Sequence, residues 1–137
     1  MRILYDARLP RGLEVEARGA VSLVRWTGDM VTDVELVQTA ADEQFDGVLF
    51  LDRDSLAQYD VQLTANSLGM ALIAVEAGSP FEAKRRVLNN IMRLRRALAR
   101  HDCLLILAAE VRPVEQLRGR DDASAAIIAE PRDWREA

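Results

Sequence analysis

The chain has 137 residues, which suits one domain and is too short for two ordinary ones. Half of its residues are hydrophobic and only 5% are aromatic, so we expect an aliphatic core. A single cysteine, Cys103, excludes an internal disulfide, and a single histidine, His101, argues against a His-rich zinc site or a Ser–His–Asp triad. The net charge of −4 argues against a generalised nucleic-acid binder.

The first half of the chain alternates apolar runs with helical patterns. No apolar run reaches about 18 residues and no signal-peptide pattern follows Met1, so we expect a cytoplasmic protein with no membrane contact. Strands are predicted at residues 2–5, 20–26 and 48–51, and helices at residues 10–18 and 32–44.

The second half of the chain continues the alternation. We expect a helix over residues 56–67 that ends near Gly69, a strand at 71–75, one long helix over 81–100, and strands at 104–108 and 111–117. Alternating strands and helices predict an α/β domain over residues 1–117, a three-layer α/β/α fold with a mainly parallel central sheet. Residues 118–137 form a tail that is either disordered or docked on a partner through Trp134.

Acidic residues follow the strands predicted to be central. Because ligands bind beyond the carboxyl ends of parallel strands, Asp6, Asp52 and Asp54 are candidate site residues, joined by Asp33 and Glu35 at the start of a helix. Clustered carboxylates repel one another unless a cation neutralises them, and hard oxygen ligands select Mg²⁺ or Mn²⁺. Each acid also has a structural interpretation. Thr32-x-x-Glu35 is a capping-box signature, and Asp52 or Asp54 could cap the helix that follows.

Three segments in order resemble the compact PIN-like proteins of bacterial toxin–antitoxin operons. They are MRILYDARLP at residues 1–10, TDVEL at residues 32–36 and VLFLDRD at residues 48–54. The resemblance spans about residues 1–75. No single motif is specific, and the order of the three carries the similarity.

The resemblance implies a metal-dependent endoribonuclease, as the toxin of a toxin–antitoxin pair. Asp6, Glu35, Asp52 and Asp54 match the family's acidic residues, with Asp33 as a substitute for Glu35. Such sites hold Mg²⁺ or Mn²⁺, which polarises the scissile phosphate and generates hydroxide from bound water, leaving a 5′-phosphate and a 3′-hydroxyl. The implied partners are an RNA substrate, an antitoxin protein and a second copy of the chain.

The chain departs from the family pattern beside its acids. Arg8 stands where a small polar residue is expected, and its cation could compete with the metal or pair with Asp6. Phe50 replaces a Thr or Ser before the acidic pair, and Ser55 replaces an aromatic residue. A catalytically inactive PIN-like module that binds RNA or protein is therefore the alternative to a nuclease.

A basic segment interrupts the otherwise acidic chain. Residues 84–101 contain seven Lys or Arg and no acid, and Arg85, Arg86, Arg93 and Arg96 are candidate RNA-binding residues. The structural interpretation is a solvated helix face. Aromatic residues that could stack on bases are scarce in this helix, which disfavours a sequence-specific reader.

A receiver-like phosphoacceptor domain also gathers acids at strand ends. Such a domain needs a Lys at a late strand–loop junction. The only lysine of this chain is Lys84, inside the basic helix, so this third interpretation is weak.

Overall fold

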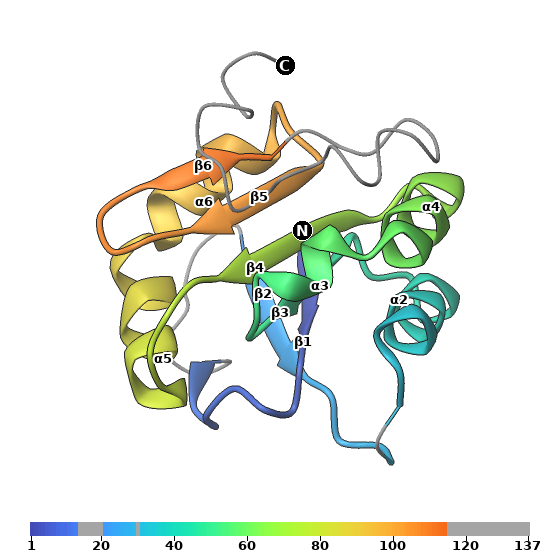
Figure 1. Cartoon of the computed structure of the whole chain (residues 1–137), viewed down its shortest axis with the longest axis horizontal. Helices are drawn as coiled ribbons and strands as arrows, with labels where there is room; N and C mark the ends of the chain where they lie inside the picture. Colours follow the sequence, from blue (N-terminus) through green and yellow to red (C-terminus); the bar gives the residue numbers. More distant parts are fainter. Residues whose placement is uncertain (14–20, 30, 115–137) are drawn as a thin grey trace.

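The computed structural model describes residues 1–13, 21–29 and 31–114, and these form one six-stranded sheet with helices on both faces (Figure 1). The strands are β1 (Arg2–Tyr5), β2 (Ser22–Arg25), β3 (Gly47–Phe50), β4 (Ala71–Val75), β5 (Cys103–Ile106) and β6 (Val111–Pro113). Their order is β2-β1-β3-β4-β5-β6, with every pair parallel except β5–β6. The predicted α/β class and mainly parallel sheet are confirmed.

The order of the five parallel strands has a functional consequence. The chain runs from β1 outward to β2 and then returns past β1 to β3, so the sheet reverses its direction of winding at the β1–β3 pair. This is the doubly wound order 2-1-3-4-5, in which ligands bind in the crevice beyond the carboxyl ends of the strands at that reversal. The two strands that end at this crevice are the ones followed by Asp6 and Asp52.

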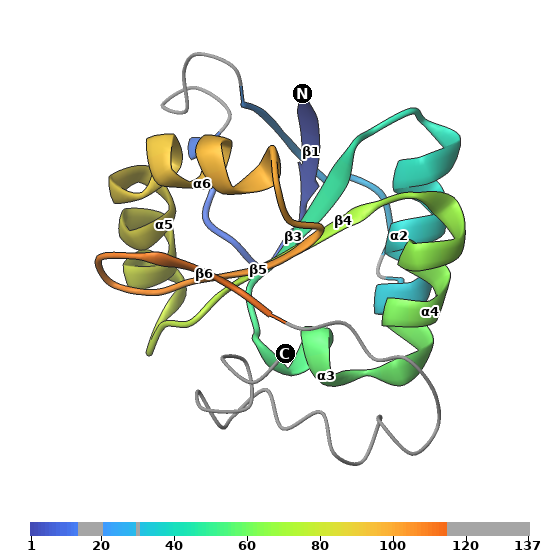
Figure 2. The ribbon, with the colours of Figure 1, turned by 90° about the horizontal axis from the view of Figure 1, so that it is seen from above.

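Helices cover the two faces of the sheet as separate layers (Figure 2). They are α2 (Asp33–Asp42), α3 (Asp54–Ala57), α4 (Tyr59–Leu68), α5 (Pro80–Asn89) and α6 (Ile91–Leu98). Alternate strand residues face opposite layers, because successive side chains of a strand point to opposite sides. Val48 packs in the cluster with the residues of α2 and α4, whereas Leu49 packs with those of α5 and α6. The arrangement agrees with a three-layer α/β/α fold.

The central strands are buried on both faces, as their continuous apolar sequences predict. All four residues of β3 are buried. Gly47 opens this strand where β3 approaches β4 closely. A Cβ atom added at Gly47 would lie 2.8 Å from the carbonyl oxygen of Ala71, so the position has no room for a side chain.

The helix predicted over residues 56–67 is two helices, α3 and α4. They are separated at Gln58, whose backbone is extended (φ −79°, ψ 119°). The predicted end near Gly69 is confirmed. Gly69 has a left-handed backbone (φ 68°), which glycine adopts without the steric cost that a Cβ atom imposes.

The single long helix predicted over residues 81–100 is wrong, because the chain breaks between α5 and α6 at Asn90. The Asn90 side chain is fully buried, and its amide nitrogen donates to the carbonyl oxygens of Arg86, Leu107 and Ala108 at 2.8, 3.0 and 3.3 Å. These bonds tie the helix break to the turn between β5 and β6.

Several predictions fall partly or wholly outside the described residues. They are the helix at 10–18 beyond Leu13, the end of the strand at 111–117, and the tail with Trp134. Among the helices of the described residues, none is both long and apolar enough to cross a membrane.

Candidate active site

Asp6 and Asp52 follow the neighbouring strands β1 and β3. The backbone N–H of Asp6 donates to the carbonyl oxygen of Leu49 at 3.0 Å, which continues the β1–β3 ladder by one residue and fixes the Asp6 backbone at the sheet edge. Asp6 is 9% exposed, so a charged carboxylate is largely withdrawn from water and requires a partner.

Arg8 is that partner. Its side chain donates to Asp6 Oδ2 through Nε at 2.7 Å and lies within 2.5 Å of the same oxygen through Nη2. The backbone N–H of Arg8 donates to Asp6 Oδ1 at 3.0 Å. Arg8 therefore contacts both oxygens of the Asp6 carboxylate, and these contacts stabilise the turn that follows β1.

Asp33 approaches the same guanidinium from α2. Its Oδ1 lies 3.9 Å from Arg8 Nη2. Its Oδ2 accepts hydrogen bonds from Ser55 Oγ at 2.7 Å and Gln58 Nε2 at 3.2 Å. Because Ser55 belongs to α3 and Gln58 stands between α3 and α4, Asp33 joins α2 to the connection that follows β3.

Asp52 supplies a third carboxylate, exposed at the end of β3. Its Oδ1 accepts the backbone N–H of Asp54 at 2.9 Å, which shapes the turn into α3. The pKa of the Arg8 guanidinium is raised, first by the hydrogen bond to Asp6 and then by the charges of Asp6, Asp33 and Asp52, against an opposing effect of burial. Three carboxylates and one guanidinium leave the group with a formal charge of −2. We call Asp6, Asp33, Asp52 and Arg8 the carboxylate cluster.

Glu35 and Asp54 are placed differently. Glu35 is exposed and completes the predicted capping box of α2: Glu35 Oε1 accepts from the backbone N–H and hydroxyl of Thr32, and Thr32 Oγ1 accepts the backbone N–H of Glu35. The Thr32 backbone and then its hydroxyl lower the pKa of the Glu35 carboxyl. Asp54 is exposed in the first turn of α3. The carboxylates gathered around Arg8 therefore include Asp33 rather than Glu35.

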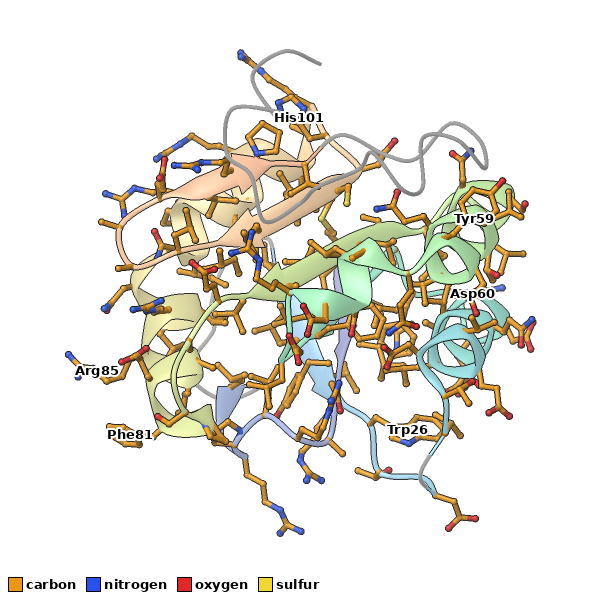
Figure 3. All side chains as sticks on the ribbon, viewed as in Figure 1. Trp26, Tyr59, Asp60, Phe81, Arg85 and His101 are labelled. Carbon is orange, nitrogen blue, oxygen red and sulfur yellow. The ribbon has the colours of Figure 1, made fainter. Side chains whose placement is uncertain are left out.

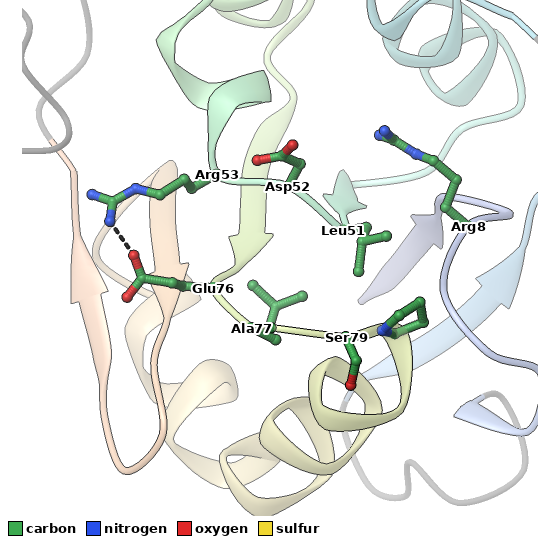
Figure 4. A pocket seen from close by; sticks show the side chains of 10 residues that line it. Arg8, Leu51, Asp52, Arg53, Glu76, Ala77 and Ser79 are labelled. Atoms are coloured by element: carbon green, nitrogen blue, oxygen red, sulfur yellow. Dashed lines mark hydrogen bonds and ion pairs between the residues drawn. The ribbon is translucent and has the colours of Figure 1, made fainter.

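Arg8 lines two clefts. One, of about 290 Å³, lies between the ends of β3 and β4 and is lined by Arg8, Leu51, Asp52, Arg53 and residues 75–80 (Figure 4). The other, of about 310 Å³, lies toward α2 and includes Asp6, Arg8, Trp26 and Asp33. In Figure 4, the Asp52 carboxylate lies between the side chains of Arg8 and Arg53.

Sequence reasoning did not select Arg53 and Glu76, which form an ion pair on the far side of the first cleft (Figure 4). Glu76 follows β4 directly, as Asp6 follows β1. The rule that selected Asp6 and Asp52 could therefore have found Glu76. Nothing in the sequence indicates that Ser55 and Gln58 bind Asp33, because those contacts depend on how α2 meets α3.

The cluster matches a hard divalent cation in its chemistry. Its donors are carboxylate oxygens, the ligands that Mg²⁺ and Mn²⁺ prefer. Within the described ranges, no three acidic, His or Cys side chains are grouped so that they could hold a metal ion. The Arg8 guanidinium stands in for the cation that these carboxylates require. A metal ion would fit there only if this side chain, 45% exposed, moved aside.

The basic segment forms the outer face of α5 and α6. Arg85, Arg93, Arg95 and Arg96 are exposed, and Figure 3 shows Arg85 pointing away from the sheet. Arg86 is less available, because it pairs with Glu82 at 3.2 Å and also donates to the carbonyl oxygen of Glu76. Arg86 thus holds the start of α5 against the end of β4, next to the first cleft.

Comparisons with protein-family models, curated proteins and solved structures gave no match.

Proposed function

We propose that this protein is a divalent-metal-dependent ribonuclease whose active site is the carboxylate cluster. Two observations support this proposal: Asp6 and Asp33 approach the Arg8 guanidinium at 2.5 and 3.9 Å, and Asp52 lines a cleft that Arg8 also lines. The three residues come from the end of β1, the start of α2 and the end of β3, at the edge of the sheet where doubly wound folds bind ligands. The formal charge of −2 that remains favours a further cation.

Asp6, Asp33 and Asp52 are the proposed metal ligands; with Arg8 paired to Asp6 they do not form a group that could hold a metal ion, so the proposal requires the side chains to rearrange when the metal binds. If Mg²⁺ or Mn²⁺ were bound there, it would supply the Lewis acidity needed to polarise a phosphodiester and to activate a water molecule for attack. The protein's contribution is to orient the donors. Ser55 and Gln58 fix Asp33 through Oδ2, the Asp54 backbone fixes Asp52 through Oδ1, and the β1–β3 ladder fixes Asp6.

RNA is the proposed substrate because a cationic face lies on the same molecule. The exposed arginines of α5 and α6 offer phosphate contacts, which bind a nucleic-acid backbone regardless of sequence. Helix α5 begins at the loop that lines the first cleft.

A catalytically inactive module that binds RNA through the same face is the second candidate. The occupation of both Asp6 oxygens by Arg8 favours it, because an internal cation makes a metal unnecessary. An antitoxin protein or a second copy of the chain remains a proposed partner in either case.

A receiver-like phosphoacceptor domain also gathers acids at strand ends, and the strand order found here is one that doubly wound domains adopt. Such a domain needs a lysine at a late strand–loop junction, such as the one that follows β5. The described chain has Leu107 and Ala108 there, while Lys84 lies on α5 and donates to the carbonyl oxygen of Arg11 at 3.3 Å. We therefore do not adopt this function.

The test is cleavage of a mixed single-stranded RNA pool in Mn²⁺ by the wild type, Asp6→Asn and Asp52→Asn. The nuclease proposal predicts cleavage by the wild type that both substitutions abolish. RNA binding without cleavage by the wild type would favour the inactive module. Cleavage that survives both substitutions would reject the carboxylate cluster as the active site.

A further inference from the structure

We infer that the cleft of about 310 Å³ beside α2, which we call the second cleft, binds one nucleobase of the RNA, with Trp26 as the residue on which this base stacks. Asp6 and Asp33 line the same cleft, so the bound base is a neighbour of the carboxylate cluster. The inference takes RNA as the ligand from the proposed function and rests on it in that respect. Binding of the base itself requires no metal.

The Trp26 ring is held in one orientation just after β2, beside the start of α2 (Figure 3). The backbone N–H of Trp26 donates to the carbonyl oxygen of Tyr5 at 2.9 Å, which extends the β1–β2 ladder by one residue. The indole Nε1–H donates to the carbonyl oxygen of Asp29 at 2.9 Å. Gly28 lies against the ring, because a Cβ atom added there would overlap with three atoms of its six-membered part. These contacts fix an aromatic ring that is only partly buried and lines the second cleft.

The second cleft has the size and the lining for a single flat ring beside Trp26. Its volume of about 310 Å³ lies at the small end of the range of about 300–1,000 Å³ that ligand pockets occupy. Val31 and Leu36 add apolar surface to its lining. Every nucleobase has a flat π-face, so an aromatic ring with apolar neighbours can stack with any of the bases. The cleft therefore has the chemistry of a stacking site.

The charge of the lining favours the base of a nucleotide over its phosphate. Asp6, Arg8 and Asp33 are the charged residues that line the second cleft, and their formal charges sum to −1. Arg8 pairs with Asp6, so the excess negative charge belongs to Asp33. This carboxylate repels a phosphate, whereas the bases of RNA are uncharged at neutral pH. The second cleft therefore suits the base part of a nucleotide.

Binding of ribotrinucleotides to the full chain in EDTA tests the inference without any metal. The probes have uridine at both ends and adenosine, uridine or an abasic ribose in the centre, so all three carry the same phosphates. The chain has two tryptophans, and Trp134→Phe leaves the indole N–H of Trp26 as its one indole signal in an NMR spectrum. The adenosine probe should shift this signal. It should bind more tightly than the uridine probe, because a purine stacks more strongly, and at least about five-fold more tightly than the abasic probe.

Two kinds of variant separate the presence of the ring from its position. Trp26→Leu removes the ring and should weaken binding of the adenosine probe at least about five-fold, whereas Trp26→Phe keeps a ring and should stay within about two-fold of the wild type. Gly28→Ala keeps Trp26 but displaces its ring, so it should also weaken binding. Gly78→Ala is the matched control and should bind as the wild type does, because a Cβ atom there would lie at an ordinary 3.8 Å from Glu82 Oε1.

Equal binding of the adenosine and abasic probes would overturn the inference, and so would binding that leaves the Trp26 signal unmoved. These two results come from the protein with an intact second cleft, so they decide the inference even if Trp26→Leu does not fold. Either result, combined with cleavage of RNA in Mn²⁺, would reject the base site and leave the proposed function standing. Base-dependent binding at Trp26 by a protein that never cleaves RNA would retain the base site and reject the nuclease.

Discussion

Glu35 caps helix α2 and lies outside the carboxylate cluster. Its carboxylate is bonded to Thr32, and Gln also forms a capping box, so Glu35→Gln should leave Mn²⁺ affinity unchanged whereas Asp33→Asn should weaken it. Calorimetric titration of both variants checks this. Loss of Mn²⁺ binding in Glu35→Gln would contradict the placement of Glu35 outside the cluster.

The lowered pKa of Glu35 also sets a pH dependence. A carboxyl whose folded pKa is depressed contributes stability above its unfolded pKa, and that contribution is lost as pH falls through the folded pKa. The free energy of unfolding of the wild type, measured in urea, should therefore decrease as the pH falls through the acid range. Glu35→Gln should show less of this weakening, and an unchanged acid dependence would mean that the capping bonds do not hold in solution.

Cys103 provides a probe of the core. Burial, followed by the charge of Asp102, raises the pKa of its thiol to about 12. The native thiol therefore stays protonated above the unfolded value of 9.0, and stability should fall as pH rises from about 9 toward 12. At pH 8, a thiol reagent should label Cys103 only after denaturant is added. Rapid labelling of the folded protein would contradict its burial.

Residue roles were predictable where a local rule applies. The Thr32-x-x-Glu35 spacing predicted a capping box, and the structure forms it. The contacts of Arg8 were open in the sequence, because pairing with Asp6 and competition with a metal both follow from a cation at that position. The interaction of Asp33 with Ser55, 22 residues apart, was invisible because it requires the packed arrangement of two helices.

The junction of α5 and α6 depends on Asn90. Asn90→Ala should destabilise the protein by about 2 kcal/mol, because it leaves the carbonyl oxygens of Leu107 and Ala108 without this buried donor. Its neighbour Asn89 is exposed, so Asn89→Ala should change stability by less than about 0.5 kcal/mol. Urea unfolding of the two variants makes the comparison. Equal effects would show that the Asn90 bonds contribute little.

The break between α5 and α6 could not be predicted from the spacing of apolar residues. Buried apolar residues keep the same helical spacing on both sides of the break: Ala83, Val87, Leu94 and Leu98. The apolar pattern is therefore the one expected of a single continuous helix. Asn90 lies among these buried residues, and its polar side chain is the feature of the sequence that could have indicated the break. Strands were easier to predict, because a short continuous apolar run such as residues 71–75 is typical of a strand buried on both faces of a parallel sheet.

The exposed arginines of α5 and α6 lead to a prediction about RNA binding by the whole molecule. Arg93→Ala combined with Arg96→Ala should weaken binding of single-stranded RNA and reduce the slope of log affinity against log salt by about 1.4, the value for two lost phosphate contacts. Fluorescence anisotropy at several salt concentrations measures it. Arg2→Ala, an exposed cation outside this face, is the control. An unchanged slope in the double variant would exclude these two arginines from the RNA interface.

The location of the site follows from strand order, which the sequence did not reveal. Acids at strand ends were visible, but adjacency of Asp6 and Asp52 requires β1 and β3 to be neighbours. Alternating strands and helices predict parallel pairing without fixing which strands pair. The sequence therefore predicted which acids to consider, and the topology determines that they share one edge.

The central claim, a divalent-cation site at the carboxylate cluster, is tested most directly by Mn²⁺ binding. Calorimetric titration of the full chain should detect binding in the wild type and a loss of at least about ten-fold in affinity in Asp52→Asn. Asp42→Asn, which changes an acid at the far end of α2, should bind as the wild type does. Absence of Mn²⁺ binding in the wild type, or equal binding in Asp52→Asn, would contradict the claim.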